Sequence, residues 1–218
     1  MAKNTDFDDN KSVIINELKE EVERRKSEIN LSNPSFDELY KLFMAYKHLY
    51  NYTKRDKNGS LVDTYTIDEI ADKLYVKIKN DIDIEKEEVF EQGRIYNALF
   101  EYYDYKDDNQ NALACLDKMV MLREEAYLVT RAQFKKLVLG DSEGALADYN
   151  RALEVVTDAD EISYIQKSIK TIDLFRDCRK TIEESEKFLK PNGLYTVVVW
   201  IALIFLIIDL IYEIFEMF

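Results

Sequence analysis

The sequence has few residues that interrupt helices and few that bind metals. Its 218 residues include five Gly and two Pro, whereas average usage would give about 15 and 11. This scarcity predicts a largely helical chain. Its His and Cys residues are His48, Cys115 and Cys178, which lie far apart without CxxC or HxxxH spacing, so a zinc or iron site built from them is not expected. The glycines form neither GxGxxG nor GxxxxGK, which excludes Rossmann and P-loop enzymes.

Positive charge is also scarce. Lys and Arg total 30 against 43 Asp and Glu, a formal net charge of −13. The last 25 residues contain three acids and no Lys or Arg, which leaves −10 for residues 1–193. An acidic body repels phosphate backbones, so we expect no nucleic-acid partner.

The feature that most constrains function is the apolar run LYTVVVWIALIFLII at residues 194–208. Fifteen residues are too few to span a hydrocarbon core of about 30 Å, so a transmembrane helix would continue to about Glu213. Lys187 and Lys190 precede the run and no basic residue follows it, which predicts a cytoplasmic N-terminal part. The acidic N-terminus does not resemble a secretory signal. We therefore expect a single-pass tail anchor at 194–218, with a buried core helix as the alternative.

Three carboxylates fall on one stripe of this tail. Asp209, Glu213 and Glu216 follow at i, i+4 and i+7. Acidic residues inside a membrane indicate a function by default. Here the three carboxylates could pair with a transmembrane partner helix, or they could join several copies of this chain. The alternative is that Glu213 and Glu216 lie beyond the bilayer and Asp209 reaches the interface.

The rest of the chain reads as a series of amphipathic helices. Ser35 and Glu38 form a capping box that predicts a helix start, and residues 53–64 read as a loop. Short turns between the later segments favour antiparallel neighbours. The expected helices cover 12–30, 35–50, 66–78, 89–105, 110–124, 126–139, 143–156 and 158–190.

A repeat with an offset of 33 residues lies in the middle of the chain. NALACLDKM at 111–119 aligns with GALADYNRA at 144–152. A small side chain lets one helix of a hairpin approach the other, and a large one a turn later fills the gap between hairpins. The matching pairs are Ala112 and Ala145, Leu116 and Tyr149, and Met119 and Ala152.

This pattern resembles the tetratricopeptide repeat (TPR) family of helical hairpins. LGDSEGALADYNRALEV looks like the turn and second helix of that repeat, with Gly140 as the turn glycine. In the earlier repeat Tyr96, Leu99 and Tyr103 match the first helix, whereas Phe100 stands where a small residue is usual. That departure argues against close packing of the first helix pair.

The resemblance divides the chain into five parts. Residues 88–157 would hold two TPR-like repeats, and an N-terminal region would supply further helices and a third, degenerate repeat. A capping and stem helix would lead to the membrane. The expected parts are a disordered 1–11, N-terminal helices at 12–87, repeats at 88–157, the stem at 158–193 and the transmembrane helix at 194–218.

First helices of such repeats line a concave groove, and this implies a site for a helix or an extended peptide of a partner protein. The chaperone-tail clamp of the family has Lys and Asn where this chain has Asn97 and Glu101, so the resemblance does not extend to chaperone adaptors. The implied partner-binding residues are Arg94, Asn97, Glu101, Tyr105, Tyr127, Arg131 and Phe134.

No arrangement of residues indicates catalysis or a cofactor. Cys115 reads as a core residue of its helix, and Cys178, beside Arg176 and Arg179, as a surface thiol with a redox or lipidation role as the alternative. We therefore expect a non-enzymatic, membrane-anchored scaffold or adaptor that binds a partner protein through its cytoplasmic TPR-like surface at a bacterial inner membrane. The alternative function is a subunit of a membrane assembly that oligomerises, or forms a pore, through the acidic stripe.

Overall fold

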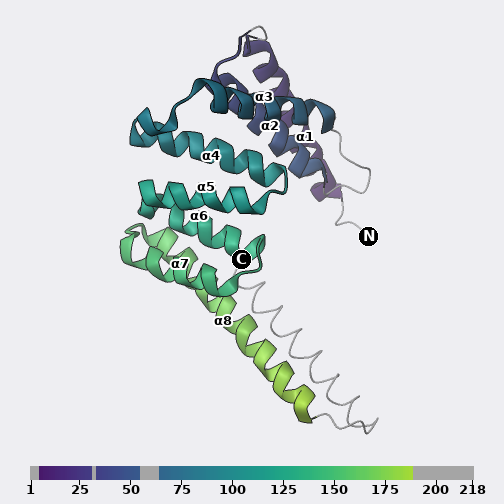
Figure 1. Ribbon diagram of the computed structural model, residues 1–218. Helices are drawn as coiled ribbons and strands as arrows, with labels where there is room; N and C mark the ends of the chain where they lie inside the picture. Colours follow the sequence, from purple (N-terminus) through teal and green to yellow (C-terminus); the bar gives the residue numbers. More distant parts are fainter. Residues whose placement is uncertain (1–4, 31–32, 55–63, 189–218) are drawn as a thin grey trace. The chain divides into compact units, whose positions relative to one another are not determined.

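The computed structural model describes residues 5–30, 33–54 and 64–188 (Figure 1). In this part of the chain all regular structure is helical, which confirms the expected all-α class. The helices are α1 (Thr5–Glu28), α2 (Phe36–Lys54), α3 (Thr64–Asp81), the short 3₁₀ helix η1 (Ile84–Lys86), α4 (Val89–Tyr105), α5 (Asn109–Leu122), α6 (Glu124–Leu137), α7 (Ser142–Val155) and α8 (Ala159–Phe188).

Most of these bounds lie within two residues of the expected ones, and α4 matches them. The largest difference is α1, which begins at Thr5 rather than at residue 12. The segment from Thr5 to Asp9 carries three Asp residues, and acids are favourable in the first turn of a helix. The helix therefore extends into residues expected to be disordered.

The chain divides into two compact units, residues 1–119 and residues 120–218, so the boundary falls near the end of α5. In the first unit α1 packs on α2, α2 on α3 and α3 on α4. Its core contains fully buried side chains from α2 and α3, and partly buried aromatic side chains of α4 pack against it. The fully buried core residues include Phe43, Ile67, Ala71, Leu74 and Ile78.

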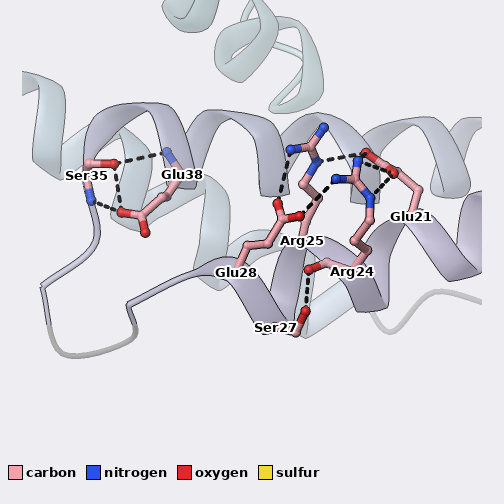
Figure 2. Close-up of polar contacts among 7 residues, drawn as sticks. All are labelled: Glu21, Arg24, Arg25, Ser27, Glu28, Ser35 and Glu38. Carbon is pink, nitrogen blue, oxygen red and sulfur yellow. Dashed lines mark hydrogen bonds and ion pairs between the residues drawn. The ribbon is translucent and has the colours of Figure 1, made fainter.

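The turn between α1 and α2 is fixed by the expected capping box, which the structure confirms (Figure 2). Glu38 accepts a hydrogen bond from the Ser35 backbone N–H at 2.7 Å, and the Ser35 hydroxyl accepts one from the Glu38 N–H at 3.3 Å. Glu38 also accepts from the Asn30 N–H at 3.2 Å. These bonds hold the pKa of Glu38 below its usual value. They therefore join the end of one helix to the start of the next.

In the second unit α6 packs along α7, and α7 packs on α8. The close approach follows from three alanines at the interface, Ala132, Ala145 and Ala152, which are fully buried beside Tyr149. Gly140 lies in the turn between α6 and α7 with a φ of +67°, a conformation that glycine adopts without steric cost. The helices α4 and α5 are not among the closely packed pairs of described helices.

Helix α8 is one continuous helix of 30 residues. Its side chains pack into the unit up to Ile172, and the charged residues between Arg176 and Glu184 are exposed. Among the described residues, none of the helices has the length and apolar character needed to cross a membrane. The expected transmembrane segment, 194–218, lies outside the described residues.

Candidate functional site

The expected groove residues of α4 are half-buried against α2. The Arg94 guanidinium pairs with the Asp37 carboxylate, which holds the pKa of Arg94 above its usual value. The Asn97 side-chain amide donates to the Tyr40 hydroxyl at 2.6 Å. Both polar groups thus have partners inside the first unit, and this face of α4 is part of a helix–helix interface.

A buried lysine continues this interface. Lys47 of α2 donates to the Glu101 carboxylate at 2.6 Å and to the Asp104 carboxylate at 2.7 Å. It also donates to the Glu101 carbonyl oxygen at 3.2 Å. A buried ammonium is costly unless it is paired and hydrogen-bonded, and Lys47 meets both conditions.

Several of these pairs share one sequence separation. Asp37 with Arg94, Tyr40 with Asn97 and Lys47 with Asp104 are each 57 residues apart. Because the members follow one another at helical spacing on both helices, the contacts hold α2 and α4 in a single register. We call this set the 57-residue ladder.

Tyr105, the fourth expected residue of α4, belongs to an aromatic cluster. Its ring meets Phe43 and Tyr50 edge-on at centroid distances of 5.8 and 6.0 Å, and burial raises the pKa of Tyr105 to about 12. Tyr102 stacks on Tyr75 at 4.7 Å. The rings of Tyr102 and Tyr105 therefore pack within the first unit.

The expected residues of α6 lie in the second unit, where Asp148 of α7 is the centre of an ion-pair cluster. Arg131 donates to both carboxylate oxygens of Asp148, at 2.9 and 2.7 Å, and Lys135 pairs with it at 2.8 Å. Phe134 is buried and Tyr127 is half-buried. Arg131 thus links α6 to α7.

Sequence reasoning missed Lys47 and Asp148, the two buried charges at the centres of these interfaces. The pattern contains a signal for both. Lys47 lies four residues after Phe43 and three before Tyr50, and Asp148 lies between Ala145 and Ala152 at helical spacing. Each charge therefore falls on the apolar face of its own helix.

A groove of about 690 Å³ lies in the first unit beside α3. Its base contains Leu39 and Leu42 of α2 with Ile70 of α3, and Ile29 and Pro34 of the α1–α2 connection form one edge. The exposed face of α3 forms the other edge. That face contributes Asp68, Glu69, Asp72, Lys73, Val76, Lys77, Asn80 and Asp81.

The remaining expectations concern thiols, metals and the acidic stripe. Cys115 is buried and Cys178 is partly exposed. Within residues 5–30, 33–54 and 64–188, no cluster of His, Cys, Asp and Glu is arranged to hold a metal ion. Asp209, Glu213 and Glu216 lie outside the described residues. The described part of the chain therefore offers the groove beside α3 as its candidate binding site.

Comparison with known proteins identified no relative of this chain. No protein-family model, curated protein or solved structure matches the chain.

Proposed function

We propose that the chain is a membrane-anchored protein scaffold or adaptor, built from TPR-like helical hairpins and without enzymatic activity of its own. The observation that carries this proposal is the α6–α7 hairpin. Its interface combines the fully buried Ala132, Ala145 and Ala152 with Tyr149, and Gly140 turns the chain between the two helices. Stacked hairpins of this kind expose extended surfaces on which other proteins bind.

The anchor in this proposal is the apolar run at 194–208, continued toward Glu213. The basic residues Lys187 and Lys190 on its N-terminal side support a cytoplasmic position for both helical units. Anchoring would raise the effective concentration of the scaffold for partners at the same membrane. We propose a bacterial inner membrane as the location.

The anchor is tested by expressing the full chain in a bacterium and washing its membranes with alkaline carbonate. The chain should stay in the membrane pellet, and protease added outside spheroplasts should leave the helical units intact. Replacing Val198 and Ile204 together by Arg should release it, because each charge near the centre of a span costs about 2.5–3.5 kcal/mol. The matched control replaces the same two residues by Leu and should remain in the pellet. Release of the unchanged chain by carbonate would refute the anchor.

The scaffold is tested separately, by purifying the full chain from mild detergent after cross-linking in cells. The proposal is supported by a defined partner that is recovered at a constant ratio to the purified chain. Recovery of this partner should fall when an untagged copy of the chain competes for it. Recovery of the chain alone at every expression level would refute it.

A second candidate function rests on the spacing of Asp209, Glu213 and Glu216. In this proposal the chain is a subunit of a membrane assembly, joined by its acidic stripe to a partner helix or to further copies. Asp209→Leu should then abolish oligomers in detergent while the helical units stay folded. Unchanged oligomers in that variant would remove this candidate.

A further inference from the structure

The groove beside α3 is elongated along that helix. Its lining runs along α3 from Asp68 to Asp81, and 13 steps of an α-helix rise about 20 Å. The lining positions Glu69, Val76 and Asn80 follow one another on a single face of the helix. A ligand that fills the groove must therefore be elongated over about three and a half helical turns.

The interior of this groove is apolar. Leu39, Leu42 and Ile70 at its base are almost completely buried. Val76 projects from α3 with 52% of its surface exposed. A row of apolar side chains spaced one turn apart would cover Val76 and extend the core that lies beneath it.

The surroundings favour a helix over an extended peptide. An extended peptide gains affinity from main-chain hydrogen bonds to the edge of a sheet. The base and one edge here come from the helices α2 and α3, whose central amides and carbonyls are already paired within each helix. A helical ligand satisfies its own backbone and needs only apolar contacts in the groove and polar contacts at its edges.

The charged residues around the groove predict the sign of the ligand's charge. Four acids and two lysines line the groove, namely Asp68, Glu69, Asp72 and Asp81 with Lys73 and Lys77. Lys73 pairs with Glu69 and Lys77 with Asp81, both at 2.7 Å, and Lys106 pairs with Asp68 and Asp72 at 2.7 and 3.1 Å. Four carboxylates and three ammonium groups leave a net charge of −1. Residues 1–119 contain 18 Lys and Arg against 26 Asp and Glu, a formal net charge of −8. The uncharged run at 194–208 has no side chains that would complement these edges.

We propose that the groove beside α3 binds an amphipathic, basic helix of a partner protein, with an apolar stripe on the base and Val76, and with Lys or Arg toward the acidic edges. This inference rests on the proposed scaffold function and names its surface and its class of partner. It moves the binding surface from the α4 face, which contacts α2, to the face of α3 beside the α1–α2 connection.

The test uses the full chain in mild detergent and a fluorescein-labelled peptide of about 14 residues, made of Leu and Lys with the leucines at i, i+3, i+4 and i+7. Binding is followed by fluorescence anisotropy. Val76→Arg should weaken binding at least about tenfold, because it places a cation against the apolar stripe. Val13→Arg is the matched control, since Val13 on α1 is 54% exposed and does not line the groove. It should change the affinity less than twofold.

Two further peptides test the two parts of the proposal. A peptide with Glu in place of Lys tests charge, and a Leu/Lys peptide with scrambled order tests the apolar stripe. Both should bind at least tenfold more weakly. Equal binding of either peptide, or equal effects of Val76→Arg and Val13→Arg, would overturn the proposal.

Hydrogen exchange of the unchanged chain with the Leu/Lys peptide keeps the test independent of how the variants fold. Added protection should concentrate in α3 and the α1–α2 connection, and protection elsewhere would overturn the groove. Self-association of the chain that is blocked by Val76→Arg would assign the groove to a second copy and also overturn the proposal. If the chain stays in carbonate-washed membranes but binds no peptide, the groove proposal fails and the membrane anchor stands. If carbonate releases the chain but the chain binds the peptide, the anchor fails and the groove proposal stands.

Discussion

Replacing Asp148 by Asn should open the second unit locally, and the structure gives the size of the effect. The Asp148 carboxylate accepts from Arg131 at 2.9 and 2.7 Å and pairs with Lys135 at 2.8 Å. Asn has nearly the same shape but no charge, so the variant leaves two cations facing a neutral amide. Removing one partner of a buried ion pair costs about 3–5 kcal/mol. The side chains of Arg131 and Lys135 are 18% and 17% exposed, so water reaches them and we expect the lower end, about 3 kcal/mol.

Hydrogen exchange measured by mass spectrometry is the suitable assay, because it reports each helix separately in a chain of two units. A loss of about 3 kcal/mol corresponds to roughly 100-fold faster exchange of the protected amides in α6 and α7. The amides of α2 in the first unit are the internal control and should exchange at the same rate in both proteins.

A second variant separates charge from packing. Asp148→Leu combined with Arg131→Met and Lys135→Met removes all three charges and keeps the apolar volume. Replacing a whole buried ion cluster by apolar residues is often neutral or stabilising, so we expect exchange in α6 and α7 within about tenfold of the unchanged chain. If the triple variant were opened as much as Asp148→Asn, uncompensated charge would be the wrong explanation.

Three further predictions concern the first unit and the α6–α7 turn. Hydrogen bonds from Ser35 and Asn30 lower the pKa of Glu38, so their contribution to folding stability is present above the pKa of the unfolded chain and is lost as the pH falls through the pKa of the folded one. An NMR titration of the Glu38 carboxyl should show the lowered pKa, and Ser35→Ala should move it toward its usual value. An unmoved pKa in that variant would show that the capping bonds are not its cause. Burial raises the pKa of the Cys115 thiol to about 11, so iodoacetamide at pH 8 should modify the partly exposed Cys178 first and Cys115 only in denaturant, which mass spectrometry of the peptides checks; early labelling of Cys115 would contradict its burial. Gly140→Ala should cost about 1–2 kcal/mol through its positive φ alone, since a Cβ there meets no atom within 4 Å, and Gly140→Asn should cost less; equal urea midpoints for all three proteins would contradict a backbone origin.

Local features of the fold followed from short stretches of sequence. The Ser35–Glu38 box and the Gly140 turn each depend on residues a few positions apart. The buried position of Cys115 followed from its place on an apolar helix face. Such features are predictable because their energies are set within one or two turns of chain.

The candidate site was less predictable, because it depends on which helices meet. Arg94 and Asn97 have the side chains of an exposed binding face, and their actual partners lie 57 residues earlier. Lys47 and Asp148 resemble ordinary surface charges in composition, and only their positions among apolar neighbours distinguish them. The groove beside α3 combines three segments, α2, α3 and the α1–α2 connection. None of these meetings is encoded by a local motif.

The two buried charges, Lys47 and Asp148, have opposite signs, which has a consequence for wrong pairings of the helices. Chains with similar helical hairpins tend to misassemble by pairing a helix with the wrong neighbour. If α2 took the place of α7 against α6, Lys47 would face Arg131 and Lys135, and α7 against α4 would bring Asp148 to Glu101 and Asp104. Each wrong pairing would bury like charges with no counterion, which costs several kcal/mol. The opposite charges of Lys47 and Asp148 would thus disfavour an exchange of α2 and α7 while the chain folds.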